Sequence, residues 1–128
     1  MHELTELAYK IQATFKIRFD DSGVRFIEDF IEQNRMKIAE EEWNPLINSC
    51  GAFLGQCIIE NYGGKWVNAS NEHLAVAFDE NNKIYPFAKV SKQFYNGLED
   101  SIYSMYSVIP VIFKIKPITK KKWWQIWR

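Results

Sequence analysis

Four glycines in the segment GAFLGQCIIENYGG, residues 51–64, are the first candidates for chemistry. A phosphate-binding loop places its glycines in a turn between a strand and a helix, with a Lys-Ser or Lys-Thr pair or a third glycine at fixed spacing. Here Gly51 and Gly55 lie within one helical apolar stripe, and the Gly-Lys pair at 64–65 is followed by tryptophan. These glycines therefore do not predict a nucleotide site.

Thiol and imidazole groups give no catalytic or metal-binding pattern. Cys50 and Cys57 occupy apolar helical positions, where thiols usually serve as inert packing. Seven residues of helix rise about 10.5 Å, and a disulfide tolerates a Cα separation of at most about 7 Å, so these two cysteines cannot bridge. His2 is terminal. His73 comes just before an alternating apolar segment, and we expect its side chain to be exposed. The sequence predicts no metal site and no cofactor.

The acidic residues group at 20–21, 40–42 and 99–100, where each has an ordinary use as a helix cap or a solvated face. One enzymatic hypothesis remains open, in which a lysine of one helix works with an acid of the next. Its residues are Lys89 or Lys92 with Glu99 or Asp100. A pocket joining these groups, with strongly perturbed ionisation, would favour it.

Charge is balanced overall but unevenly placed along the 128 residues. Lysine plus arginine and aspartate plus glutamate number sixteen each, so nucleic acid is not expected as a partner. Residues 114–128 hold six cations and no acids, which leaves ten cations and sixteen acids elsewhere. An acidic body with a basic tail is the result.

The composition and the N-terminal segment indicate the structural class of the protein and the cellular compartment in which we expect it. Apolar residues make up 47% of the chain and aromatic residues 16%, enough to fill a core. The first seventeen residues contain acids and no apolar run typical of a signal peptide. Apolar runs stay far below the roughly 20 residues of a membrane span. Together with two free thiols, these features lead us to expect a cytoplasmic protein.

Periodicity predicts helices and a three-stranded antiparallel meander. The helices are expected at 22–38, 45–62, 87–96 and 99–108, with Asp21 or Ser22 capping the first and Pro110 interrupting the last. The strands are expected at 65–69, 73–79 and 82–87. Less definite are 4–12 (a short helix or an arm), 15–20 (a short strand or an extended lead-in) and 111–116 (a short strand or an arm).

The helix predicted at 45–62 is unusually thin over two turns, which carry Asn48, Ser49, Cys50, Gly51, Ala52 and Gly55. A glycine inside a helix costs about 1 kcal/mol relative to alanine. Close approach of another element is the usual compensation. We therefore expect this helix to be central and packed on two sides.

Three blocks of residues stand out between positions 15 and 110: a GxxxG helix, a GGxW strand entry and a PFxKV block followed by GxEDS. Their residues are Gly51, Gly55, Gly63, Gly64, Trp66, Pro86, Phe87, Lys89, Val90, Gly97, Glu99, Asp100 and Ser101. This set resembles a small family of uncharacterised bacterial domains, except that Cys50 stands at the first position of the helix motif. The resemblance implies an α+β fold and a bacterial origin, and it implies no activity.

Two surfaces are candidates for binding. Aromatic and basic residues near the sheet could form a peptide- or protein-binding face, with core packing of Trp66 and Phe87 as the alternative that we favour. The face consists of Trp66, Tyr85, Phe87, Lys89 and Lys92. The second surface is the basic aromatic tail. Three alternatives are open for it: it folds back on the body, it contacts a membrane or a partner, or it binds single-stranded nucleic acid. Its contact residues are Lys120, Lys121, Lys122, Trp123, Trp124 and Trp127.

The sequence thus predicts an α+β fold with helices packed on a small three-stranded antiparallel meander. It predicts a single domain at 1–117 and a basic aromatic tail at 118–128. The favoured function is non-catalytic binding of another protein, one version being a bacterial immunity-type protein that captures a basic toxin. A small enzyme with an unrecognised site, and a peripheral protein with weak membrane-surface contact through the tail, are the alternatives.

Overall fold

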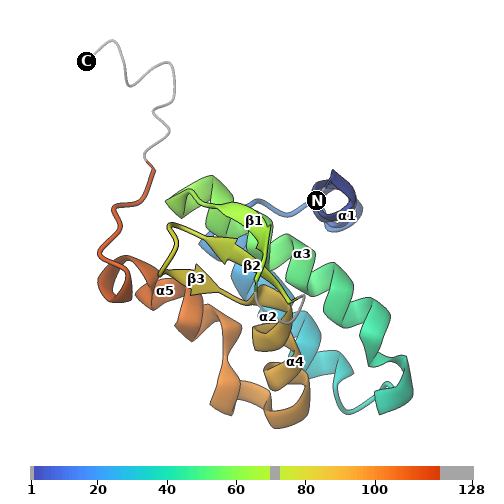
Figure 1. The fold of residues 1–128 in the computed structure, drawn as a ribbon. Coiled ribbons are helices and arrows are strands. Elements are labelled where there is room, and N and C mark those ends of the chain that lie inside the picture. The colour runs from blue at the N-terminus through green and yellow to red at the C-terminus, as the bar shows by residue number, and fades with distance from the viewer. Residues whose placement is uncertain (1, 70–72, 119–128) are drawn as a thin grey trace, which may run out of the picture.

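The computed structural model describes residues 2–69 and 73–118. It has five α-helices and one three-stranded antiparallel sheet, and it is therefore an α+β fold as the sequence predicts (Figure 1). The helices are α1 (His2–Phe15), α2 (Asp21–Asn34), α3 (Trp43–Tyr62), α4 (Pro86–Asn96) and α5 (Ile102–Ile112). The strands are β1 (Lys65–Asn68), β2 (Leu74–Ala77) and β3 (Lys83–Ile84).

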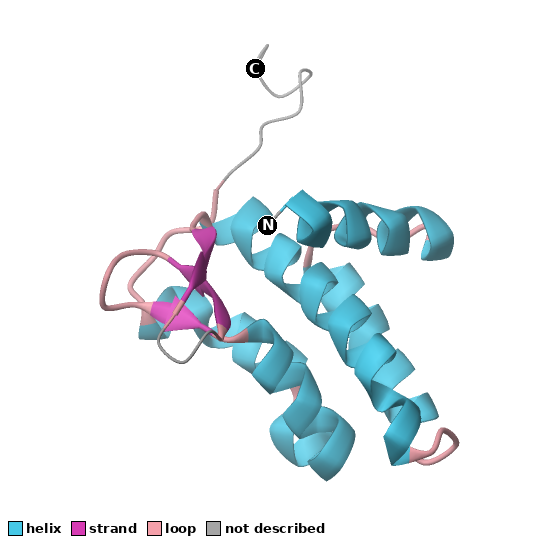
Figure 2. Cartoon of the chain, turned by 45° about the vertical axis from the view of Figure 1, so that its right-hand side comes forward, coloured by secondary structure: helices cyan, strands magenta, loops and turns pink. Residues whose placement is uncertain are grey.

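The helix α3 is the centre of the fold, because it contacts α1, α2, α4 and the strand β2. Nine consecutive residues of α3, from Cys50 to Ile58, are buried. The sheet lies to one side of the helices rather than among them (Figure 2). Residues from β2, β3 and α4 complete the core around α3, with Val76, Ile84 and Val90 among those that are buried. The expectation of a central helix is confirmed.

The sheet is the predicted meander, in the order β1-β2-β3. Its register aligns Trp66 with Val76 and Val76 with Ile84. The turn between β2 and β3 is held by the carboxylate of Asp79, which accepts a hydrogen bond from the backbone N–H of Asn81 at 2.8 Å. Short polar side chains favour turns by such local bonds, so the predicted turn at ENN (80–82) is confirmed.

The alternating segment 15–20 does not form a strand. The helix α1 continues to Phe15 and ends where Lys16 adopts a positive φ of 55°. The alternation of apolar residues reflects packing instead: the Phe15 ring lies 5.3 Å from that of Phe26, and the Phe19 ring lies 5.1 Å from that of Phe53. Residues 16–20 are instead a turn at Lys16, irregular backbone and a bend before α2.

The start and end of α2 differ from the prediction. Its N-cap is Asp20 rather than Asp21 or Ser22, and the Asp20 carboxylate accepts hydrogen bonds from the backbone N–H groups of Ser22 and Gly23. The helix ends at Asn34, four residues earlier than expected. The Asn34 side chain donates to the Phe30 carbonyl at 2.7 Å, and such local bonds compete with helical hydrogen bonding.

Proline has less effect on the helices than the sequence suggests. The helix α3 begins at Trp43, so Pro45 lies in its first turn, where the missing N–H costs nothing. Pro110 does not interrupt α5, which continues to Ile112. Pro110 has no N–H to donate to the carbonyl of Tyr106, one turn earlier, and α5 ends two residues after it. The segment 111–116 accordingly holds the end of α5 and irregular backbone, and no strand.

The helix α5 begins later than predicted, because a short 3-10 helix, Gly97–Asp100, precedes it. Ser101 is the N-cap of α5, and its hydroxyl accepts a hydrogen bond from the Ser104 N–H at 3.0 Å. Glu99 and Asp100 therefore stand just before α5, near the positive end of its dipole.

Candidate functional site

The two glycines of α3 seat two aromatic rings. A Cβ at Gly51 would lie 2.4 Å from Phe87 Cδ1, and one at Gly55 would lie 2.1 Å from Trp66 Cζ2. The two rings also contact each other, with centroids 5.6 Å apart. The glycines are thus a packing device that lets β1 and the start of α4 approach α3. The core-packing alternative for Trp66 and Phe87 has this direct structural basis.

A groove of about 430 Å³ lies next to the Phe87 ring. Four elements build it: α1, α3, the start of β2, and the junction of β3 with α4. Its walls are mainly apolar and its rim is polar. The lining residues are Glu3, Leu4, Leu7, Asn48, His73, Leu74, Tyr85, Phe87 and Ala88.

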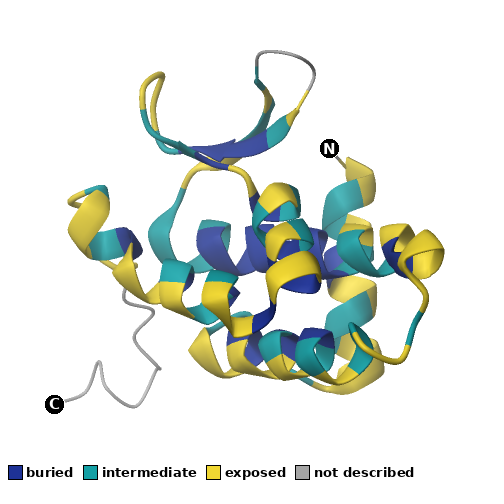
Figure 3. Cartoon of the chain, turned by 90° about the horizontal axis from the view of Figure 1, so that it is seen from below, coloured by how far each residue is buried: buried dark blue, intermediate teal, exposed yellow. Residues whose placement is uncertain are grey.

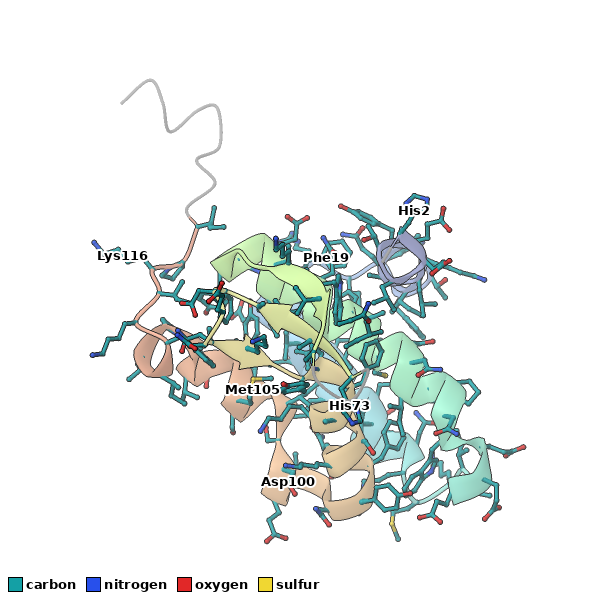
Figure 4. The ribbon with its side chains drawn as sticks, viewed as in Figure 1. His2, Phe19, His73, Asp100, Met105 and Lys116 are labelled. Carbon is teal, nitrogen blue, oxygen red and sulfur yellow. The ribbon has the colours of Figure 1, made fainter. Side chains whose placement is uncertain are left out.

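His73, which Figure 4 labels, is exposed as predicted and stands at the start of β2 on the groove rim. Its described lining residues include no serine, threonine, cysteine or lysine. The mainly apolar walls suit the groove to binding an apolar group.

The structure brings together part of the predicted binding face. Tyr85 and Phe87 line the groove, and Trp66 supports Phe87 from behind. Lys89 lies on another side of α4, where it lines two further pockets, and Lys92 is exposed on α4 outside the groove lining. The predicted face is therefore divided between an aromatic part at the groove and a basic part along α4. Sequence reasoning missed the contribution of α1, since its Leu4 and Leu7 have no distinctive pattern.

The enzymatic hypothesis corresponds to a smaller pocket of about 210 Å³. Lys89, Glu99 and Asp100 line it, whereas Lys92 does not. Asp100 accepts a hydrogen bond from Asn96 Nδ2 at 2.6 Å. Ser101, the nearest hydroxyl in sequence, is engaged in capping α5. The pocket brings a cation and carboxylates together, and of its groups Asp100 is bonded to the end of α4 and the Ser101 hydroxyl caps α5.

A buried polar network behind that pocket was missed by sequence reasoning. Gln93 is fully buried on α4; its Nε2 donates to Glu32 Oε2 at 3.0 Å, and its Oε1 accepts from the Ile102 N–H at 2.9 Å. Glu28 of α2 accepts from the Ser101 hydroxyl and from the Tyr103 N–H. These bonds satisfy the free N–H groups at the start of α5. The residues that form these bonds lie far apart in sequence, so no local sequence pattern predicts the bonds.

The thiols are unsuited to nucleophilic chemistry. Burial raises the pKa of the Cys50 thiol to about 12. Burial, with the nearby acids Asp20 and Glu60 as smaller causes, raises the pKa of Cys57 well above its ordinary value. Because the thiolate is the reactive form, both groups are inert at neutral pH. Over residues 2–69 and 73–118, no three His, Cys, Asp or Glu side chains gather to hold a metal ion.

The predicted tail contacts, Lys120, Lys121, Lys122, Trp123, Trp124 and Trp127, lie outside the described residues. In the described part of the chain, each helix is too short or too polar to pass through a lipid bilayer. Comparison with known proteins finds no matching family model, no matching curated protein and no matching solved structure. The groove and its surroundings are therefore the basis for a functional proposal.

Proposed function

We propose that this chain is a non-catalytic protein-binding domain, and that the groove beside Phe87 receives an apolar side chain of its partner. The observation that carries the proposal is the fixed aromatic wall of the groove. Phe87 is seated against Gly51 and packed on Trp66, so it presents its ring without much loss of side-chain freedom on binding.

Tyr85 adds an exposed aromatic side chain at the same wall, with 36% of its surface accessible. Aromatic residues in well-packed pockets supply much of the binding energy at protein interfaces. Leu4 and Leu7 close the groove from α1 and would exclude water around an inserted side chain. A volume of about 430 Å³ accepts one or two large side chains.

The charge of the body favours a basic partner. Residues 1–113 carry ten cations and sixteen acids, for a net charge of −6. Complementary charge accelerates encounter between proteins. A bacterial immunity-type protein that captures a basic toxin is the version of this function that fits the charge and the chain length. The alternative of a small enzyme rests on the pocket at Lys89 and has less support, because Asp100 there is bonded to Asn96 and the Ser101 hydroxyl caps α5.

The test is site-specific photo-crosslinking in cells of the source organism. Benzoylphenylalanine replaces Tyr85 at the groove, and in the control it replaces Tyr95, which is 54% exposed at the other end of α4. We expect a discrete protein adduct at position 85 that unlabelled wild-type protein competes away, and none at position 95. Equal adducts at both positions, or no adduct at position 85, would contradict the proposal.

Once the partner is identified, its affinity is measured against salt concentration. Attraction between an acidic body and a basic partner predicts weaker binding as salt rises. Affinity that does not change with salt would remove the argument for a basic toxin, while the groove itself would still be tested by the crosslinking result.

A further inference from the structure

The helix α5 has apolar residues on both its inner and its outer side. Its sequence, IYSMYSVIPVI, buries Ile102, Tyr106 and Ile109 against the core. On the outer side Val111 is 76% exposed and Ile112 is 64% exposed. The exposed colouring at the end of α5 is visible in Figure 3. The outer side of α5 also carries the exposed Ser104 and Ser107, so its most exposed apolar side chains lie at its C-terminal end. Exposed apolar patches mark protein or membrane interaction sites.

Cations accompany this exposed apolar surface. Lys114 and Lys116 follow α5 directly, and both are exposed. Lys83 and Lys89 line a groove of about 290 Å³ whose apolar part includes Ile112. Figure 4 shows Asp100 near the start of α5 and Lys116 beyond its end, so the two ends of this helix carry opposite charge.

The acids near this end are few and partly engaged. Asp79 and Glu80 stand in the turn between β2 and β3, and Glu60 stands near the end of α3. The Asp79 carboxylate accepts hydrogen bonds from the turn residues Asn81 and Asn82. Among the described residues, the cations Lys83, Lys89, Lys114 and Lys116 outnumber these three acids.

The described chain continues from the end of α5 to Ile118, which lies at the end of α3. Ile118 is 48% exposed, and its N–H donates to the Asn61 carbonyl at 2.7 Å. Residues 119–128, TKKKWWQIWR, continue from this point. A mixture of lysine and tryptophan next to exposed aliphatic side chains is typical of segments that bind at the lipid–water interface.

We propose that the C-terminal end of α5 docks on an anionic phospholipid membrane surface. The docking surface consists of Val111, Ile112, Lys114 and Lys116, which we term the α5 end. Val111 and Ile112 enter the boundary between headgroups and acyl chains, and the two lysines bind lipid phosphates. A single weak anchor gives only marginal membrane binding, so the apolar surface and these lysines act together.

The experiment is co-sedimentation of the full chain with lipid vesicles. One set contains phosphatidylcholine alone, and the other contains phosphatidylcholine with phosphatidylserine. We expect at least tenfold stronger partition onto the anionic vesicles, and weaker partition at high salt. Absence of binding to the anionic vesicles, or equal binding to both sets, would overturn the proposal.

Two pairs of substitutions test the α5 end itself. Replacing both lysines (Lys114→Gln with Lys116→Gln) should weaken partition by about fivefold for each lysine removed. Replacing both aliphatic residues (Val111→Asn with Ile112→Asn) should weaken it by about tenfold, because apolar burial in the interface is lost. The matched control is Leu98→Asn, which removes an apolar residue that is 60% exposed at the acidic end of α5, and it should leave partition unchanged.

Two further experiments test whether the tail alone, or a second copy of the chain, accounts for the exposed surface of α5. If replacing Trp123, Trp124 and Trp127 by serine abolishes partition while the Val111→Asn, Ile112→Asn pair binds normally, α5 takes no part and the proposal is wrong. Sedimentation velocity of the wild-type chain without lipid is the other check. A dimer that the Val111→Asn, Ile112→Asn pair dissociates would show that a second copy covers this surface, and it would also overturn the proposal.

Discussion

The middle of α3 and the end of α5 are both apolar helical segments, and the fold treats them in opposite ways. Gly51 and Gly55 have no side chains, and aromatic rings from β1 and α4 occupy the space beside them. At Val111 and Ile112 the side chains are large, and most of their surface is accessible. The first segment contributes stability through close packing, whereas the second leaves apolar surface available.

The difference teaches that apolar composition alone does not say which surface is covered. The position of a helix in the fold decides it: α3 has neighbours on several sides, whereas α5 packs mainly on α2 with one side and ends at the edge of the molecule. Small residues in α3 are present where neighbouring elements of the same chain approach it closely. Large aliphatic residues at the end of α5 are surplus to folding, which is why they suggest an external contact.

The largest expected effect comes from Gly55→Leu. Even the first added carbon would lie 2.1 Å from the Trp66 ring, so the side chain cannot be accommodated without displacing β1 from α3. We expect a loss of about 3 kcal/mol or more in unfolding free energy, at the upper end of overpacking costs. Urea denaturation measures it. In a Trp66→Ala background the same substitution should cost less, and a variant that melts like the parent would show that α3 is not closely packed.

The next effect is alkaline unfolding through the buried thiols of α3. The Cys50 pKa is raised from 9.0 to about 12 in the folded state, so its stabilising contribution is complete below pH 9 and is lost as pH rises toward 12. The unfolding free energy should fall by about 1.4 kcal/mol per pH unit for this group. Urea denaturation between pH 8 and 11 measures the slope. Cys50→Ala should reduce the slope by that amount, and an unchanged slope would contradict the assignment.

A smaller effect is expected for Gly51→Ala. The new Cβ would lie 2.4 Å from Phe87 Cδ1, but this ring is only half-buried and can tilt outward. We expect a loss of about 1–2 kcal/mol, although alanine is the better helix former by about 1 kcal/mol. Thermal unfolding compares it with Asn44→Ala, an exposed site on the same helix that should not lose stability. Stabilisation by Gly51→Ala would show that Phe87 is not held against α3.

The smallest effect should come from the exposed end of α5. Replacing Val111 and Ile112 together by asparagine should change the unfolding free energy by less than about 1 kcal/mol, because little buried surface is lost. Ile109→Asn is the matched control on the same helix: Ile109 is 1% exposed, and its replacement should be severely destabilising. Similar losses for both would mean that the surface is covered in the intact chain, and the contrast between α3 and α5 would disappear.

Much of the fold was predictable because its signals are local. The meander follows from alternating segments and turn residues, and the central position of α3 follows from its glycines. The ends of the helices were less predictable: Asp20 rather than its neighbours caps α2, and α5 continues for two residues past Pro110. Apolar alternation at 15–20 suggested a strand because packing on two helices and pairing in a sheet produce the same pattern.

The surroundings of the groove were predictable only in part. Aromatic residues at the start of α4 are visible in the sequence, and Tyr85 and Phe87 do line it. That α1 supplies the opposite wall depends on tertiary contacts that leave no mark in a short amphipathic helix. The same holds for Gly23, where a Cβ would lie 1.9 Å from the Arg18 carbonyl oxygen, a constraint set by the path of the backbone.

The bond from the Tyr103 N–H to Glu28 joins residues 75 positions apart and has a consequence for synthesis of the chain. Until α5 has been synthesised, α2 lacks the helix on which it mainly packs, and the core cannot be completed. Folding must therefore wait for α5, so nascent chains stalled before residue 102 should remain sensitive to protease, and chains that include α5 outside the ribosome should resist it.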